Sequence, residues 1–351
     1  MEFSVADSPT VRQCSTRRLI AAFLVLIGLL ATACGSSSQS RNIGSPSESP
    51  AEADLSVGRT AAAPASDGSL DTNADGNLDP TAATTNQNVV HVLGSVRSTP
   101  VETDVWQEEV PIVGSDLATV ASVNCNLADD CDLNTIADWA EGRVDVINLA
   151  TSASVLTADE LLELTDILEA RGVAVVGFGP DQSSAERPFT FVNQDLTVSI
   201  HALSVVAVPE VQATGETAGI AGPESLDAVL DAVAVSRDAE QGVVVLLDWG
   251  GLEERAPSTN ETDIVERLIG AGANAVIGHG PDFLQRFDQV GGGVAAYSLG
   301  NAVSAVDEPV RRDTAVLRLE FARPGRSCLL PATATSQGPT LDDLGLLTCA
   351  R

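Results

Sequence analysis

From Val89 onward, short β-branched runs alternate with helical patterns along the chain. This alternation is typical of an α/β domain, in which strands and helices follow one another. Glycines separate the helices from the strands that follow them at three places, near positions 172, 242 and 272. Nine runs are predicted to be strands: Val89–Leu93, Leu117–Val123, Val144–Leu149, Val173–Phe178, Val198–Val208, Val243–Leu247, Ala275–Ile277, Val294–Ser298 and Thr314–Phe321.

Three segments are predicted to be helices. The clearest is Ala158–Arg171, because Thr157-Ala-Asp-Glu160 forms a capping box and Gly172 follows the last turn. Residues 224–239 follow a proline, and residues 261–271 precede a glycine. We also interpret Gly291–Gly293 as a hairpin loop. The simplest organisation is one α/β domain over residues 89–351, which is long enough to bury a large core.

The chain before this domain is polar and nearly free of large apolar side chains. Residues 34–88 consist mostly of Ser, Ala, Asp, Thr, Asn, Pro and Gly, so they cannot bury enough surface to offset the entropy of ordering. We predict a disordered tether. Asp71, Asn73 and Asp75 have the spacing of the first half of a calcium loop, but Ala82 stands where the bidentate Glu belongs. Weak calcium binding and an acidic linker remain alternatives.

The first residues have the pattern of an export signal. Three arginines precede the apolar run Leu19–Ala31, which is short for a membrane span and ends in Ala31-Thr-Ala-Cys34. This ending resembles a bacterial lipobox, which implies a signal peptide over residues 1–33 and a lipid on Cys34. We expect an extracytoplasmic protein anchored to the bacterial cell membrane. A plain secretory signal or a membrane anchor is the alternative, and both also place the domain outside the cytoplasm.

Four further cysteines lie in the domain, and an exported protein meets an oxidising environment. Four cysteines permit three connectivities, of which the sequence-local pairs Cys125–Cys131 and Cys328–Cys349 are favoured. A zinc site is the competing interpretation, but the sequence offers neither C-x-x-C spacing nor neighbouring histidines.

The formal charge restricts the possible partners. The chain carries 19 basic and 49 acidic residues, a net charge of −30 at pH 7. Nucleic acids are excluded as partners because they are bound through clustered basic side chains. Adhesion to anionic lipid is disfavoured for the same reason.

Four segments, taken in order, carry a family resemblance: VDVINLATSASVLTADELLELTDILEARGVAVVGFG from Val144, VVVLLDWGGLEERAP from Val243, LIGAGANAVIGHGPDFLQ from Leu268 and YSLGNAV from Tyr297. They resemble the bacterial capsule-synthesis CapA family, whose members act on a poly-γ-glutamate capsule. The resemblance covers roughly residues 89–321. It implies a metallophosphatase-like layered α/β/β/α sandwich with mixed sheets.

The positions where the family holds metal ligands are mostly substituted in this chain. The family's Gly-Asp after the first strand corresponds to Gly94-Ser95, and the Glu of its Asn-Leu-Glu corresponds to Ala128. Its Asn-Asn-His corresponds to Thr151-Ser152-Ala153. The His of His-Trp-Gly is Asp248, and Gly-His-His-Pro-His reads Gly278-His279-Gly280-Pro281-Asp282. Ser, Thr and Ala cannot replace the carboxylates and imidazoles of a two-metal centre.

The remaining candidates for chemistry are Asp248, His279 and Asp282. One His and two carboxylates could hold a single divalent metal ion if the strand ends adjoin. The alternative is that the two aspartates are solvated loop acids and that His279 hydrogen-bonds a neighbouring carbonyl. His91 and His201 are expected to be packed core or edge residues. Trp249, Ser298 and Asn301 stand where the resembled family has them and could contact a polymer, although packing explains Trp249 equally well.

We therefore expect a CapA-like surface lipoprotein that takes part in the synthesis, export or retention of a capsule or envelope polymer. With most ligands replaced, we expect no cofactor and no metal-dependent turnover. The first alternative is an active single-metal phosphoesterase or hydrolase that acts on such a polymer. The second is a structural scaffold with no affinity for a polymer.

Overall fold

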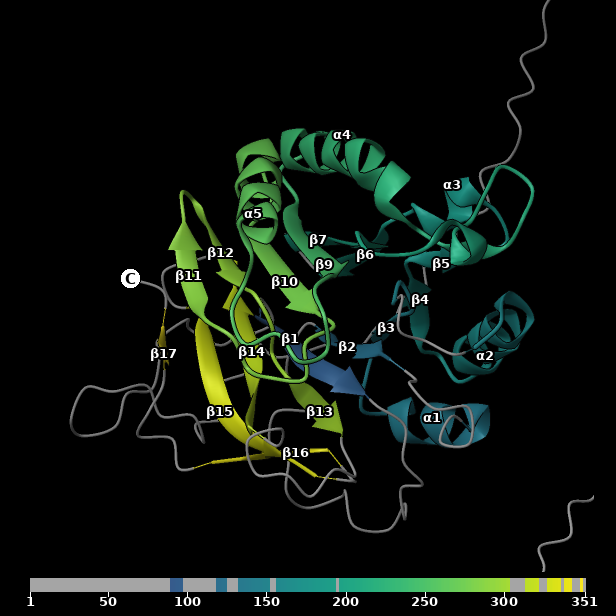
Figure 1. Ribbon diagram of the computed structural model, residues 1–351, viewed down its shortest axis with the longest axis horizontal. Helices are drawn as coiled ribbons and strands as arrows, with labels where there is room; N and C mark the ends of the chain where they lie inside the picture. The colour runs from purple at the N-terminus through teal and green to yellow at the C-terminus, as the bar shows by residue number, and fades with distance from the viewer. Residues whose placement is uncertain are drawn as a thin grey trace, which may run out of the picture. The chain divides into compact units, whose positions relative to one another are not determined.

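The framework of the protein, seen in a computed structural model, is a pair of mixed β-sheets (Figure 1). The structure describes residues 89–96, 118–124, 132–151, 156–193, 196–303, 313–321, 327–335, 338–342 and 348–349. Within them, one sheet has nine strands in the order β16-β15-β14-β1-β2-β3-β4, with β13 beside β1 and β17 beside β15. The other has six strands in the order β11-β12-β10-β9-β7-β6. A short ribbon pairs β5 with β8.

The strands are β1 (Val89–Val96), β2 (Ala118–Val123), β3 (Val146–Asn148), β4 (Ala174–Val176), β5 (Phe178–Gly179), β6 (Phe189–Asn193), β7 (Leu196–Ser204), β8 (Gly219–Ile220), β9 (Gly242–Asp248), β10 (Ala275–His279), β11 (Phe287–Val290), β12 (Gly293–Ala296), β13 (Asn301–Val303), β14 (Asp313–Glu320), β15 (Cys328–Ala334), β16 (Pro339–Leu341) and β17 (Thr348–Cys349). The helices are α1 (Leu133–Ala140), α2 (Ala158–Ala170), α3 (Gln182–Ala185), α4 (Leu226–Asp238) and α5 (Thr259–Ala271).

Helix boundaries follow the capping chemistry in the sequence. Helix α2 begins at the predicted capping box, in which Thr157 and Glu160 bond each other's backbone, and it ends before Gly172 with φ of 78°. Helix α5 begins two residues earlier than predicted because Ser258 and Glu261 form a second capping box. The segment after Pro223 starts as a short 3-10 turn, so α4 itself begins only at Leu226.

The strand predictions are correct in place but not in every boundary. The run Val173–Phe178 is divided into β4 and β5, because Gly177 turns the chain with φ of 81°. Strand β7 ends at Ser204, so the predicted continuation to Val208 is wrong, and Val206 and Val208 are exposed. The hairpin expected at Gly291–Gly293 is confirmed by the antiparallel pair β11–β12.

Alternation along the strands divides the core into layers. On β9, Val244 and Leu246 belong to the core shared with the nine-stranded sheet, whereas Val243, Val245 and Leu247 pack with residues of α4 and α5. Figure 1 shows α4 and α5 over the six-stranded sheet, and α1 and α2 beside β2 to β4. The fold is therefore the layered α/β/β/α sandwich with mixed sheets that the resemblance implied.

Candidate functional site at the strand ends

Three polar side chains lie side by side where parallel strands of the six-stranded sheet end. Ser204 of β7 pairs in register with Asp248 of β9, which pairs with His279 of β10. The strand positions two residues earlier are Ala202, Leu246 and Ile277, which lie in the core between the sheets. Because side chains alternate along a strand, Ser204, Asp248 and His279 point to the same inner face. Ser204 Oγ donates a hydrogen bond of 2.7 Å to Asp248 Oδ2.

The nine-stranded sheet has a matching polar row at one level. Asn301 of β13 pairs with Ser95 of β1, Ser95 pairs with Ser122 of β2, and Ser122 pairs with Asn148 of β3. Asn148 Nδ2 donates to Ser122 Oγ at 3.0 Å, and its Oδ1 accepts from the backbone N–H of Ala150 at 2.8 Å. The four side chains supply hydroxyls and amides, and none supplies a carboxylate or an imidazole.

A buried contact brings the two rows together at one end of the sandwich. Asn301 Nδ2 donates to Asp282 Oδ1 at 3.2 Å, and Asp282 belongs to the loop that follows β10. The backbone N–H of Asp282 donates to Leu252 O at 2.9 Å, which fastens this loop to the one after β9. Both Asp282 and Asn301 are at most 3 % exposed. The contact explains why the two carboxyl-end edges face each other.

Glycines on both sides of His279 allow the loop to pack closely. A Cβ on Gly278 would collide with Tyr297 O, and one on Gly280 would collide with Trp249 O. Gly280 also has φ of 115°, a conformation that favours glycine. The Gly-His-Gly pattern therefore reflects close packing of backbone against backbone.

His279 is sealed in this end of the core. Its side chain is 1 % exposed, and neither ring nitrogen has a hydrogen-bond partner among the described residues. Burial lowers the pKa of His279 to about 3, so the imidazole is neutral at physiological pH. Ser95 Oγ is likewise buried without a partner in the described part of the chain. Two polar groups therefore face the inter-sheet space with unused hydrogen-bonding capacity.

These residues do not fit a metal centre. No group of three or more His, Cys, Asp or Glu side chains within the described ranges is arranged so that it could hold a metal ion. Asp248, His279 and Asp282 therefore do not form the three-ligand cluster considered from the sequence. The carboxylates of Asp248 and Asp282 accept hydrogen bonds from Ser204 and Asn301 instead.

Trp249, Ser298 and Asn301 are each 1 % exposed, and their partners belong to the protein itself. Trp249 Nε1 donates to Tyr297 O at 2.9 Å, and the two rings stack with centroids 5.9 Å apart. Ser298 Oγ donates to Pro281 O at 3.1 Å. In this arrangement the three side chains brace the loops, and a polymer could reach them only if the loops moved.

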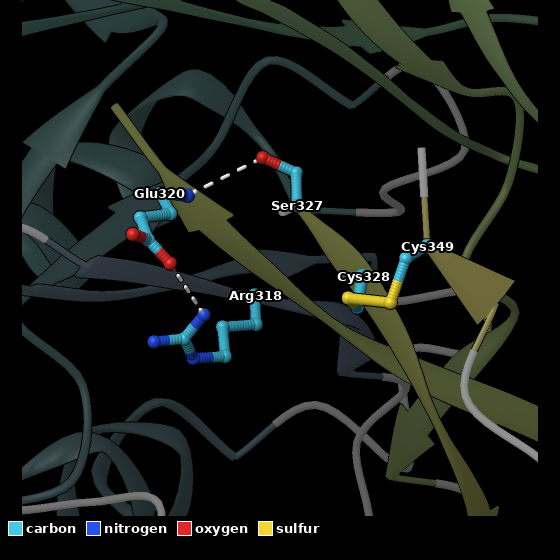
Figure 2. Close-up of a disulfide and its surroundings, with 5 residues drawn as sticks. All are labelled: Arg318, Glu320, Ser327, Cys328 and Cys349. Carbon is cyan, nitrogen blue, oxygen red and sulfur yellow. Dashed lines mark hydrogen bonds and ion pairs between the residues drawn. A yellow bond between two sulfur atoms is a disulfide. The ribbon is translucent and has the colours of Figure 1, made fainter. Parts of the chain in front are cut away.

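Several residues singled out in the sequence lie outside the described residues. They are Cys34, Asp71, Asn73, Asp75, Cys125, Cys131, Ala128, Ser152 and Ala153. Cys328 and Cys349 form a disulfide that joins β15 to β17 (Figure 2), and this pair is one of the two sequence-local pairs. His91 and His201 are buried, at 4 % and 0 % exposed.

Ser122, Asn148 and Ser204 were not recognised in the sequence as members of the site. Each is the last or next-to-last residue of its strand. The available signal was a polar residue at the carboxyl end of a predicted parallel strand. These three residues belong to the site because of the order of the strands in the sheets, and the pattern of apolar residues does not predict that order.

Comparisons with known proteins agree with the resemblance. The family described as "Bacterial capsule synthesis protein PGA_cap" matches residues 71–306, more than half of the chain. A "Capsule biosynthesis protein CapA" of Bacillus anthracis is 30% identical over 107 residues, which are 29% of this chain and 26% of that protein. A "PGA biosynthesis protein CapA" of Bacillus subtilis strain 168 is 24% identical over 152 residues, 43% of this chain and 40% of that protein. The matches thus span well under half of either relative.

Solved structures with a similar arrangement are more distant in sequence. A phosphatase from Mycoplasma pneumoniae has a TM-score of 0.48 and 10% identity, with 70% of this chain and 94% of that chain covered. A putative 5'-nucleotidase from Staphylococcus aureus has a TM-score of 0.44 and 12% identity, with 73% and 54% covered.

Proposed function

Because the chain belongs to the bacterial capsule synthesis protein family, and so has a role related to the capsule, we propose that it handles a capsule or envelope polymer without metal-dependent turnover. It would bind, guide or retain a polymer such as a poly-γ-glutamate-like chain rather than cleave one. The proposal also includes a lipid on Cys34 that holds the domain on the outer side of the cell membrane.

The observation that carries the proposal is the chemistry of the two polar rows. A two-metal hydrolase needs several carboxylates and imidazoles around a shared water. The rows offer Ser95, Ser122, Asn148, Asn301 and Ser204, whose hydroxyls and amides are poor ligands for Zn²⁺ or Mn²⁺. The two carboxylates nearby are engaged by hydrogen-bond donors of the protein.

His279 supports the same interpretation. A catalytic imidazole needs access to substrate or metal and a pKa near the working pH. Burial lowers the pKa of His279 to about 3, and its side chain is closed off from solvent. A neutral, enclosed imidazole can fill space between the loops, but as placed it cannot exchange protons with a substrate.

The test of non-catalytic action combines chemistry with a capsule assay. We expect the purified protein to hold no stoichiometric Mn, Fe or Zn by elemental analysis and to hydrolyse no phosphodiester. In a strain that lacks the chromosomal copy, His279→Ala and the wild type should restore the same amount of surface polymer. Tight metal binding together with turnover that is lost in His279→Ala would overturn the proposal in favour of a single-metal hydrolase.

The test of binding uses the polymer directly. We expect labelled envelope polymer to co-sediment with the protein, and protein boiled before the assay should not retain it. An unchanged capsule in the deletion strain and no retention of polymer would favour a structural scaffold instead.

The lipid anchor has its own experiment with a matched control. The described residues contain no helix long and apolar enough to cross a membrane. Cys34→Ala is expected to release the protein from the membrane fraction and to remove the lipid mass from its N-terminal peptide. Cys14→Ala, a change of the same type within the signal segment, should leave anchoring intact. Release by both variants, or by neither, would contradict lipidation at Cys34.

A further inference from the structure

A cleft lies away from the strand-end site, between helix α5, strand β11 and the short strand β17. It has a volume of about 510 Å³, and its lining includes Glu266 from α5, Arg286 and Asp288 near β11, and Cys349 from β17. Tyr297, which stacks on Trp249, forms part of its floor. The cleft therefore combines elements of both sheets.

Among the described residues that line the cleft, Arg286 is the one cation, and it is paired with a carboxylate. Arg286 makes an ion pair of 3.1 Å with Asp288, and its guanidinium lies 4.6 Å above the centre of the Tyr297 ring. Its charge is thus balanced by a neighbouring carboxylate and its flat face is occupied. An anionic ligand would have to compete with Asp288 for this group.

Glu266 is the charged lining residue that has no ion-pair partner among the described residues. It forms no ion pair with any described side chain. The next residue on α5, Arg267, is turned to Asp227 of α4 at 3.0 Å and does not compensate it. The pKa of Tyr297 is raised, chiefly by burial, and both Asp288 and Glu266 add to this rise, which places both carboxylates within electrostatic reach of the phenol. Among its described lining residues, the cleft thus has one negative charge more than positive charges.

The remaining polar groups also accept hydrogen bonds. Thr262, Glu266, Asp288 and Gln289 line the cleft and carry oxygen atoms that can accept hydrogen bonds, and Thr262 and Gln289 can also donate them. The carboxylate of Glu266 favours a ligand that supplies donors and positive charge. An ammonium group supplies three donors and one positive charge.

The wall opposite α5 depends on a covalent bond. Within the described residues, strand β17 pairs with β15 through Cys328 with Cys349 and Leu329 with Thr348. The disulfide ties this two-residue strand to β15 (Figure 2), and Cys349 is one of the residues that line the cleft. Without the bond, two ladder pairs are too few to keep so short a strand docked.

We propose that this cleft binds a molecule that carries a protonated amino group, with Glu266 as its counter-ion and the Cys328–Cys349 disulfide holding one wall of the site. The inference goes beyond the capsule-related function, because it concerns a different surface and a ligand of the opposite charge to an acidic polymer. It does not require catalysis at the strand ends.

The experiment compares three probes of one size on the full chain: a glucosamine disaccharide, its N-acetylated form and a galacturonic acid disaccharide. Titration calorimetry at about pH 6 keeps the amine protonated and the carboxyls ionised. We expect the amine probe to bind at least about tenfold more tightly than the other two, with an affinity that falls as salt is raised. Equal affinity for the acetylated probe, preference for the acidic probe, or no binding of the amine probe would overturn the proposal.

Two variants locate the site. Glu266→Gln should weaken binding of the amine probe by about tenfold, which is the loss of one charge-assisted hydrogen bond. Glu163→Gln on α2, the same change at another exposed glutamate, should alter it by less than about twofold. Equal weakening in both variants would show a general effect of charge and contradict the site.

The role of the disulfide is tested by the double variant Cys328→Ser, Cys349→Ser and by mild reduction of the wild type. Both should lower affinity for the amine probe while circular dichroism shows the α/β core intact. Unfolding of the double variant would make the reduced wild type the decisive sample. Full affinity in that folded, reduced protein would contradict the assigned wall.

Discussion

Two buried histidines lie on opposite faces of the six-stranded sheet, and their surroundings differ. His201 of β7 lies on the side of α4, and its Nε2 is 2.9 Å from Ser199 Oγ, which also accepts a bond from Ser236 of α4 at 3.3 Å. His279 of β10 lies on the inner face, and no described residue bonds either ring nitrogen. Burial lowers the pKa of both side chains, to about 4 for His201 and about 3 for His279.

The comparison shows that one ring nitrogen of His201 has a hydrogen-bond partner in the core, whereas His279 is buried with no described partner for either ring nitrogen. One ring nitrogen of His201 is hydrogen-bonded to Ser199, and it is Ser199 that makes the bond to Ser236 of α4. His279 has the desolvation cost of a buried imidazole without a matching bond, in a row whose other members are Asp248 and Ser204. A buried polar group with no partner calls for an explanation. Under the interpretation drawn from the family resemblance, His279 would be the remainder of a site whose other ligands were replaced.

The largest expected effect is acid destabilisation through these two histidines. Below about pH 6.5 the unfolded chain takes up a proton at each histidine, whereas the folded protein does so only near pH 4 or 3. Stability therefore falls as the pH drops through this window, by about 1.4 kcal/mol per pH unit for each residue. Between pH 7 and about pH 4.5 the two together should cost on the order of 5 kcal/mol.

Urea denaturation of the wild type and His279→Leu at both pH values measures this loss. Between the two pH values, the free energy of unfolding of His279→Leu should fall by roughly half as much as that of the wild type, because one of the two titrating histidines is absent. A variant as acid-sensitive as the wild type would show that His279 is not enclosed as described.

The second prediction contrasts the two positions at pH 7. His201→Leu should destabilise the protein by about 1–2 kcal/mol, because Ser199 loses a buried partner. His279→Leu should stabilise it by about 1 kcal/mol, because an apolar side chain replaces an imidazole that lacks partners. The free energies of unfolding from urea titrations decide between these signs, and destabilisation of similar size in both variants would remove the distinction.

The third prediction concerns the bond that joins the two rows. Asn301→Leu removes the donor to Asp282 Oδ1 and should cost about 2 kcal/mol, since a buried carboxylate loses a hydrogen bond. The same substitution at Asn134, on exposed α1, serves as a control with less than about 0.5 kcal/mol of change. A negligible effect at Asn301 would mean that the loop after β10 is held by its backbone contacts alone.

The smallest effects distinguish two serines of the opposing rows. Ser204→Ala should cost about 1 kcal/mol because Asp248 loses its 2.7 Å hydrogen bond. Ser95→Ala should be close to neutral, because its hydroxyl has no partner among the described residues. A cost at Ser95 equal to that at Ser204 would reveal a bond that the described side chains do not account for.

Much of the fold follows from local pattern. The nine predicted strands all correspond to observed strands, and the helix with the Thr157 capping box is confirmed as α2. The elements that the sequence did not predict are the helices α1 and α3 and the strands β6, β8, β11, β13 and β15 to β17. Most of them are short or lie at the edge of a sheet, so their own sequence carries little periodicity, and contacts with the rest of the sheet decide their conformation.

The candidate site was predicted in part. His279 and Asp248 were correctly placed at strand ends, because a short strand ending in glycine is visible in the sequence. Trp249 was a possible polymer contact and is instead packed between β9 and Tyr297. The sequence did not show whether Trp249 contacts a polymer or packs in the core. Both faces of a buried strand are apolar, so the pattern does not show to which side the residue after the strand points.

The sequence by itself determined the alternation of strands and helices of an α/β domain and the net charge of −30, since each depends on residue type and local order. Only the tertiary structure decided that Ser95, Ser122 and Asn148 lie in one row, that Asp282 meets Asn301, and that Glu266 and Cys349 line one cleft. These relations join residues from distant parts of the chain. They depend on strand order and on the packing of two sheets, which no local pattern encodes.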